Sequence, residues 1–364
     1  SMRNTAIGYY AMRAVTTGSN NTAIGKDALK TNQTGNNNTA LGYRSLEVNT
    51  ANNNTAVGYK SLLANTSAAA VTGIGYQALA ANTTGAENTA VGSSALGANT
   101  TGGQNTAMGA YALVANTTGS DNVALGKNVL STNTSGGYNV AVGNYSLNLN
   151  ATGGNNTAIG FYALGKNTAS NGTAVGISAL KENTTGSKNT AFGANALEKN
   201  TSGNENTALG SNALEKNTTA SGNAAFGKSA LQETTIGQYN TGSGSHSLQA
   251  NVGGNYNTAH GYTSLYKNTS GNSNTSVGHS SLSENATGDS NTAIGYGAGD
   301  AITTGSSNVY VGHGADASAG NVSNEIVIGH GATGTGNNQI ALGNTSITHI
   351  KAQVNSFQPD LIAM

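Results

Sequence analysis

Residues 21–37 read NTAIGKDALKTNQTGNN, and the same pattern begins again at Asn38 with NTALG. A short alternating segment ends at a glycine, an Ala-Leu or Ser-Leu pair follows, and a polar stretch rich in Asn, Thr and Gly completes the unit. This unit fills almost all of the 364 residues at a spacing of 17, although the units that end at Gly58 and Gly176 have 16 and the last step, from Gly329 to Gly343, has 14. Because no separate segment remains, the short period predicts that the whole chain is a solenoid.

The elements of this solenoid are expected to be β-strands. No segment sustains an apolar stripe at the helical period, and every unit contains glycine, which disfavours helices. The segment 22–24, Thr-Ala-Ile, alternates with the period of a strand. We therefore predict an all-β parallel β-solenoid of about 21 turns. Stacking at about 4.8 Å per turn gives a rod of roughly 95 Å.

The alternation also predicts which side chains face inward. Thr of the motif is replaced by Val at Val123 and Val140, which favours Thr and Ile as the interior face and Ala as the exterior face. A thin coil with two or three sizeable apolar side chains per turn needs support from neighbouring chains. We therefore expect a parallel homotrimer, intertwined or side by side, whose copies approach each other over the small alanines. These alanines are Ala23, Ala40, Ala56, Ala90 and Ala107.

Composition excludes several kinds of partner. Only 8% of the residues are charged, 15 basic against 15 acidic, so no basic stripe is present to bind a phosphate backbone or an anionic lipid surface. We expect no nucleic acid partner and no membrane insertion. The chain has no cysteine, which excludes disulfides and thiolate metal sites.

The pattern of chemically reactive residues predicts no enzyme and no cofactor. The acidic residues are scattered over outer positions and form no recurring pair that could serve as general acid and base. Three histidines, His279, His313 and His330, directly follow a motif glycine. On a trimer axis such a residue would occur three times at one level, but the spacing favours outward corner histidines, so no metal site is predicted.

Candidate receptor-binding residues come from the least regular part of the repeat, residues 234–262. Irregularity in a regular rod is where a specific ligand surface is expected. Tyrosines directly after the motif glycine are expected to pack between neighbouring turns, with stacking on sugars as the alternative. The candidate residues are Tyr239, His246, Tyr256, His260 and Tyr262.

Two protein families share features with the chain. The block NTAIGxxAL resembles the head repeats of trimeric autotransporter adhesins, which wind into a left-handed parallel β-roll, although the outer loop is longer here. The segments 306–312 (SSNVYVG), 324–329 (NEIVIG) and 340–351 (IALGNTSITHIK) look like the part of phage tail-fibre and tail-spike proteins that precedes an intramolecular chaperone. The second resemblance favours a virion fibre.

The tail-fibre resemblance implies a homotrimeric appendage of the virion that binds a bacterial surface receptor, a glycan or a protein, without catalysis. It divides the chain into continuous repeats over 1–305, less regular terminal repeats over 306–350, and a tail over 351–364 before a missing chaperone or a truncated end. The head of a trimeric adhesin at the bacterial cell surface is the alternative.

A third possibility is an ice-binding solenoid. Its basis is the regular ranks of threonine, which recur at about the spacing of stacked strands. The exchanges of Thr for Val predict that these ranks face inward, and this makes ice binding a minor alternative. The threonines concerned are Thr22, Thr39, Thr55 and Thr89.

Overall fold

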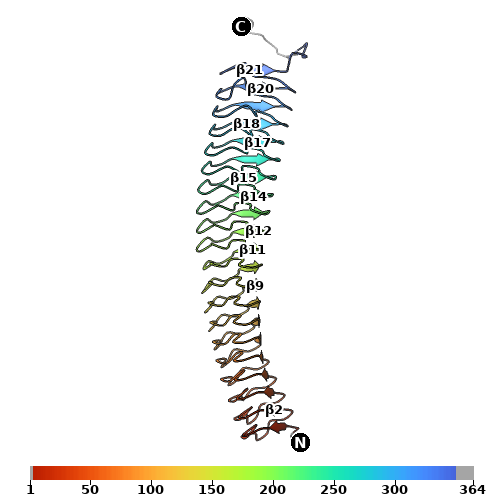
Figure 1. The fold of residues 1–364 in the computed structure, drawn as a ribbon, viewed down its shortest axis with the longest axis vertical. Coiled ribbons are helices and arrows are strands. Elements are labelled where there is room, and N and C mark those ends of the chain that lie inside the picture. Colours follow the sequence, from red (N-terminus) through yellow and green to blue (C-terminus); the bar gives the residue numbers. More distant parts are fainter. Residues whose placement is uncertain (1–2, 350–364) are drawn as a thin grey trace, which may run out of the picture.

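The computed structural model describes residues 3–349 as one column of 21 short strands in a single parallel sheet, with the first strand at one end of the column and the last at the other (Figure 1). Residues 3–349 contain no helix, so the predicted all-β parallel solenoid is confirmed. The predicted tail, residues 351–364, lies outside the described residues.

Every strand has three residues. The strands are β1 (Thr5–Ile7), β2 (Thr22–Ile24), β3 (Thr39–Leu41), β4 (Thr55–Val57), β5 (Thr72–Ile74), β6 (Thr89–Val91), β7 (Thr106–Met108), β8 (Val123–Leu125), β9 (Val140–Val142), β10 (Thr157–Ile159), β11 (Thr173–Val175), β12 (Thr190–Phe192), β13 (Thr207–Leu209), β14 (Ala224–Phe226), β15 (Thr241–Ser243), β16 (Thr258–His260), β17 (Thr275–Val277), β18 (Thr292–Ile294), β19 (Val309–Val311), β20 (Ile326–Ile328) and β21 (Ile340–Leu342).

Consecutive strands pair in strict register, so equivalent residues of neighbouring turns lie side by side. Thr157 of β10 pairs with Val140 of β9 and with Thr173 of β11. The second of these intervals is one of the 16-residue units, so the missing residue is taken from the loop while the strand keeps its register. Equivalent residues of successive turns therefore form lines that run along the column, and each such line is here called a rank.

A corner glycine ends each strand, and the backbone there excludes other residues. Gly25 has a φ of 132°. A Cβ on Gly25 would lie 2.5 Å from the carbonyl oxygen of Gly42 in the next turn. The motif glycine is thus required both by its backbone conformation and by the close approach of the turn stacked on it.

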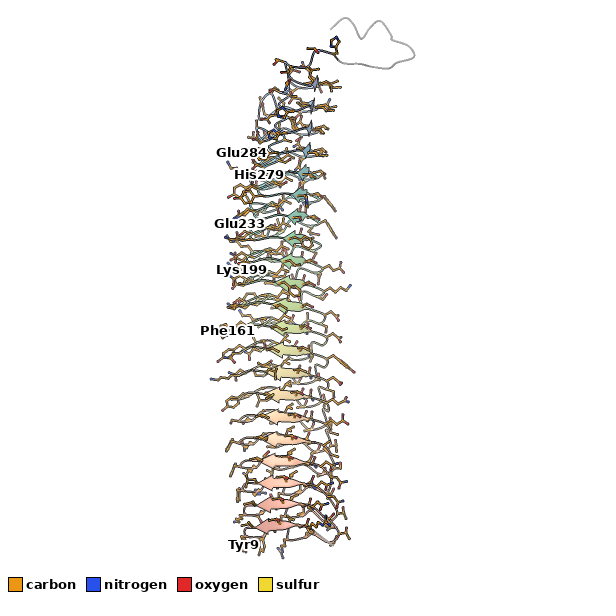
Figure 2. The ribbon with its side chains drawn as sticks, turned by 90° about the vertical axis from the view of Figure 1, so that its right-hand side faces the viewer. Tyr9, Phe161, Lys199, Glu233, His279 and Glu284 are labelled. Carbon is orange, nitrogen blue, oxygen red and sulfur yellow. The ribbon has the colours of Figure 1, made fainter. Side chains whose placement is uncertain are left out.

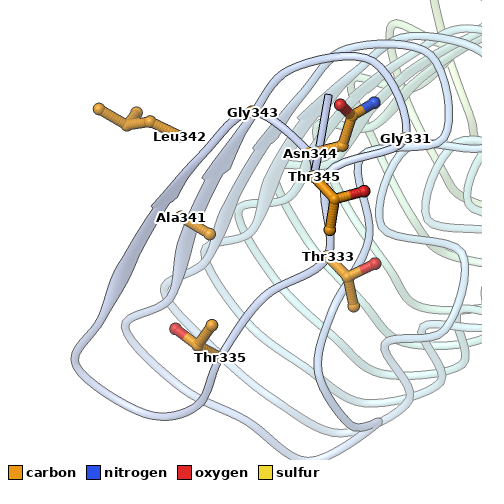
Figure 3. A pocket seen from close by; sticks show the side chains of 8 residues that line it. All are labelled: Gly331, Thr333, Thr335, Ala341, Leu342, Gly343, Asn344 and Thr345. Atoms are coloured by element: carbon orange, nitrogen blue, oxygen red, sulfur yellow. The ribbon is translucent and has the colours of Figure 1, made fainter. Parts of the chain in front are cut away.

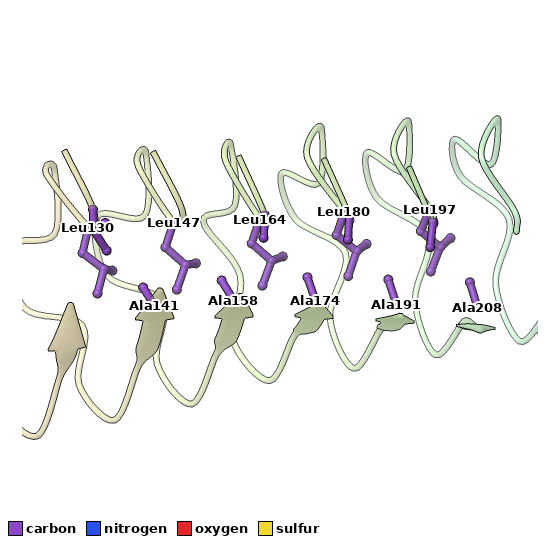
Figure 4. Close-up of a cluster of buried hydrophobic side chains, with 14 of the residues drawn as sticks. Leu130, Ala141, Leu147, Ala158, Leu164, Ala174, Leu180, Ala191, Leu197 and Ala208 are labelled. Atoms are coloured by element: carbon purple, nitrogen blue, oxygen red, sulfur yellow. The ribbon is translucent and has the colours of Figure 1, made fainter. Parts of the chain in front are cut away.

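The core lies between the alanine of each strand and the leucine that follows the corner, and this overturns the predicted faces. Ala158 and Leu164 are both fully buried. Figure 4 shows the rank of leucines opposite the rank of alanines along several turns. Thr and Ile point outward instead, as the exposed Ile159 illustrates. The prediction was wrong because the leucine fills the narrow column, leaving room for only a small side chain on the strand.

The second apolar segment of each turn forms a tight turn instead of a strand. Leu164 has a φ of 50°, in the left-handed region that leucine rarely adopts. Its N–H donates to the carbonyl of Ala179 in the next turn at 2.9 Å. The same conformation recurs from Leu29 to Leu282, so packing and interturn hydrogen bonds hold a backbone that is locally unfavourable.

Two buried ranks of asparagine satisfy the polar groups beside the core. In the rank before the strands, Asn38 N donates to Asn21 Oδ1 at 2.9 Å, and Asn21 Nδ2 donates to Gly35 O at 2.8 Å. In the rank after the leucines, Asn116 Nδ2 donates to Asn99 Oδ1 at 2.8 Å. These side chains join successive turns along the column and keep buried backbone groups paired.

The last turns replace the leucine rank by a different packing. The position of the core leucine is taken by Gly299 and then by Asp316. Tyr310, the middle residue of β19, fills the space and is fully buried. A Cβ on Gly299 would lie 2.6 Å from the Tyr310 ring, so the large and the small residue compensate each other. The Tyr310 hydroxyl donates to Glu325 Oε2 at 3.3 Å, and both burial and that carboxylate raise the pKa of the hydroxyl.

Candidate functional site

The outward surface of the sheet, formed by the first and third residues of β1–β21, is here called the sheet face. Its large apolar side chains are accessible to solvent within the single chain: Ile24 is 36% exposed, Phe192 43% and Ile294 45%. Because a strand alternates, burying the small alanine in the column forces the larger Thr and Ile outward. The fold thus leaves its bulkier strand residues outside its own core.

Two ranks of side chains make up the sheet face. The first residues of the strands are mostly threonine, with Val, Ile or Ala in the other strands. The third residues are apolar in every strand except β15 and β16, which carry Ser243 and His260. No first or third residue of β1–β21 is Asp, Glu, Lys or Arg. The sheet face is therefore an uncharged, mainly apolar stripe.

The stripe is large enough to be an interface. With strands about 4.8 Å apart and three residues of about 3.3 Å across, it measures roughly 95 Å by 10 Å, or about 1,000 Å². Stable protein interfaces bury about 800 Å² per partner. Contiguous exposed apolar patches beyond a few hundred Å² generally mark interaction sites.

Charged side chains lie on the loops instead, where they pair between turns. Lys216 Nζ lies 2.6 Å from Glu233 Oε2, and Lys267 Nζ lies 2.6 Å from Glu284 Oε2. Figure 2 shows Lys199, Glu233 and Glu284 projecting from one side of the column. These exposed pairs contribute little to stability, and they leave the sheet face as the main apolar surface.

The structure places the predicted receptor-binding residues on four separate lines, because His246 lies two residues after its corner glycine and Tyr262 only one. Tyr239 and Tyr256 lie just before β15 and β16, and their rings stack with centroids 5.4 Å apart. His246 and Tyr262 follow the corner glycines, with ring centroids 6.1 Å apart. His260 lies between the two pairs as the exposed third residue of β16. The five residues are thus neighbours on the sheet side, but they do not converge on one pocket.

A longer stack of rings continues from Tyr262 along the rank directly after the corner glycines. Its centroid separations are 5.2, 4.9, 5.0 and 5.1 Å from Tyr262 through His279, Tyr296 and His313 to His330. The predicted packing of tyrosines between turns is confirmed for Tyr262 and Tyr296. Because the rings cover each other's faces, mainly their edges remain for a ligand.

Two carboxyl groups near the C-terminal end form a pair that the sequence did not predict. Burial raises the pKa of the Asp300 carboxyl to about 6, and its hydrogen bond with Asp316 adds to the shift. Asp316 Oδ1 also accepts hydrogen bonds from the backbone N–H groups of Ala301 and Ala317 at 3.0 and 2.8 Å. Their only signal in the sequence is that Asp316 stands at the position of a core leucine.

A shallow depression of about 470 Å³ lies at the last turn (Figure 3). Its lining is glycine, threonine and aliphatic side chains with one asparagine, Asn344, whose Nδ2 donates to His330 O at 2.7 Å. No charged residue lines this depression.

Residues 3–349 contain no group of three or more His, Asp or Glu side chains placed to hold a metal ion. Over the same residues there is no helix with the length and apolarity of a bilayer span. Comparison with protein-family models and with curated proteins found no match to this chain.

Proposed function

We propose that the chain is a structural and receptor-recognition component of a phage tail fibre. It acts as a parallel homotrimer packed through the sheet face, and it binds a bacterial surface glycan or protein without catalysis. The observation that carries the proposal is the apolar sheet face, which runs the length of a rod-shaped chain and has no charge on it.

The contact surface proposed here replaces the alanine surface expected from the sequence. Ala23 and its equivalents are buried within the chain's own core and cannot touch a neighbour. Strands of one chain pair with the next strands of the same chain, which supports copies that pack against each other without exchanging strands. Covering the sheet face buries about 1,000 Å² per copy, as a stable assembly requires.

The trimer and the virion location rest on the resemblance of 306–312, 324–329 and 340–351 to tail-fibre segments. Closed cyclic symmetry with an axis along the rod turns the same face of each copy inward, which matches a single apolar stripe. The corner and loop surfaces then occur three times at each level, and weak contacts to a repetitive bacterial surface add up through multivalency.

Within this assembly the candidate receptor residues separate into two groups. Tyr239 and Tyr256 flank the sheet face and stay accessible at its edge, as do His246 and Tyr262 on the other side. His260 lies on the sheet face itself, so the proposal places it between copies.

The first test is the mass of the protein in solution by light scattering. We expect a value near three times 36.1 kDa for the natural chain and near 36.1 kDa for Ile159→Lys/Ile294→Lys, which puts charge on the sheet face. Lys199→Glu, an exposed loop substitution, is the matched control and should leave the trimer intact. A monomeric natural chain would refute the assembly.

The second test is binding of the trimer to a panel of purified bacterial surface polysaccharides and to whole cells. We expect Tyr239→Ala/Tyr256→Ala to weaken binding while the mass stays unchanged. Equal binding by this variant, in a preparation that binds at all, would remove these tyrosines from the receptor site.

Ice binding is a second candidate that one observation favours. Thr22, Thr39 and Thr55 point outward, so the reason for expecting them inside was wrong. A regular rank of outward threonines is a surface that can order water, but only if other copies do not cover it. Thermal hysteresis with a monomeric mass would favour ice binding, whereas a trimeric mass without hysteresis would exclude it.

A further inference from the structure

Parallel copies of this chain face a problem of register. Neighbouring strands present nearly the same two outward side chains, as the pairs Thr89↔Thr106 and Val91↔Met108 illustrate. If one copy slides along another by one turn, threonines again meet threonines and apolar residues meet apolar residues. Apolar contact is non-directional, so it scarcely distinguishes the shifted assembly from the aligned one.

The rank of third residues on the sheet face, which is otherwise apolar, contains one polar interruption. Ser243 and His260, the third residues of β15 and β16, lie side by side in the rank. On either side of them the rank is apolar, with Phe226 in β14 and Val277 in β17. Ser243 is half-buried and His260 is exposed on the sheet face, so both side chains can reach a neighbouring copy.

Ser243 and His260 have different neighbours across the interface in aligned and in shifted copies. In alignment, serines lie at one level and histidines at the next, where they can hydrogen-bond across the interface. A shift by one turn places His260 of one copy beside Val277 of another, and Phe226 beside Ser243. Polar groups then become buried against apolar surface without partners, which is unfavourable.

We propose that Ser243 and His260 fix the register in which parallel copies of this chain pack through the sheet face. The proposal rests on the homotrimer described above and adds the residues that align it. A single polar position in an apolar seam specifies register in the same way in coiled coils, at some cost in stability.

Disulfide cross-linking tests the register directly, because the chain has no cysteine of its own. One version of the chain carries Val91→Cys, and a second version with a different tag carries Met108→Cys. These are the third residues of β6 and β7 and lie far from the polar pair. Each version is assembled alone, and the two versions are also assembled together. After oxidation, cross-linked pairs that carry both tags are isolated, since these join residue 91 of one copy to residue 108 of another. Same-site cross-links report aligned copies, and mixed-site cross-links report a shift by one turn.

With Ser243 and His260 present, we expect same-site cross-links to dominate. In Ser243→Val/His260→Ile the fraction of mixed-site cross-links should rise about tenfold, the change that a loss of about 1.4 kcal/mol of discrimination produces. The mass should stay trimeric, since the new side chains are apolar. Val277→Ile/Ile294→Val, in the same rank, is the matched control and should change nothing.

The possible failures are distinguishable. A monomeric natural chain overturns the homotrimer and this inference with it. A trimer without same-site cross-links overturns packing through the sheet face. A trimer with same-site cross-links that Ser243→Val/His260→Ile leaves unchanged overturns only the role of these two residues.

Discussion

Truncating one core leucine, Leu164→Ala, is expected to destabilise the column by about 3–4 kcal/mol. The side chain is fully buried, and its loss removes three carbons at about 0.8 kcal/mol each, with a cavity added. The cavity cannot close, because the turns on either side are fixed by backbone bonds: Leu164 N to Ala179 O at 2.9 Å and Leu147 N to Ala163 O at 3.0 Å. The cavity therefore adds to the lost transfer energy, and the estimate lies near the middle of the usual range of about 2–5 kcal/mol for such substitutions.

Urea unfolding followed by circular dichroism measures this loss, and hydrogen exchange locates it. Exchange should accelerate most in the turns that hold Leu147, Leu164 and Leu180, since each repeat contacts mainly its neighbours. The control is Lys166→Ala in the same turn, which removes only an exposed ion pair with Glu182 and should cost less than about 1 kcal/mol. Equal effects of the two substitutions would refute the core assigned to the leucine and alanine ranks.

Three further substitutions probe other parts of the fold. Gly160→Ala should destabilise the chain by more than about 2 kcal/mol, because φ at Gly160 is 133° and the new Cβ would meet the carbonyl oxygen of Gly176. Urea unfolding measures this loss, and an unchanged unfolding midpoint would contradict the corner geometry. Asn116→Ala should cost at least about 2 kcal/mol by leaving Asn99 Oδ1 without its donor, and an effect near zero would count against the ladder. Since the pKa of Asp300 is raised to about 6 in the folded chain, its carboxyl favours folding when protonated, so the protection factors of the C-terminal turns, which are exchange rates corrected for the intrinsic pH dependence of amide exchange, should fall as pH rises from 4 through 6. Asp300→Asn should abolish that pH dependence, and a dependence that persists would assign it to another group.

The strands and their stacking could be predicted from sequence because they depend on a period. The spacing of the motif glycines sets the corners, and the alternation in Thr22-Ala23-Ile24 sets the strand, whatever faces inward. The inward face could not be obtained from hydrophobicity. Isoleucine is more apolar than alanine, and the exchange of Thr for Val seemed to mark an interior position.

One signal for the correct face was nevertheless present in the sequence. Tyr310 is the single large aromatic residue at the alanine position, and it occurs where the core leucine has given way to Gly299. Such compensation in size implies that the two positions face each other across one space. The candidate interface was missed for the same reason, since the residues taken for core form the sheet face. Contacts such as Asp300 with Asp316 depend on the terminal packing, which has no period to predict it.

The ladder of hydrogen bonds between turns also determines how the rod responds to force. Because these bonds run along the rod, tension between its two ends loads them one turn after another, as in peeling, and not all at once, as in shear. Each turn that detaches releases 17 residues, which extend to roughly 55–60 Å in place of about 4.8 Å. A chain of this kind lengthens in steps under load and keeps the remaining turns intact, so it behaves as a mechanical damper between whatever is attached to its ends.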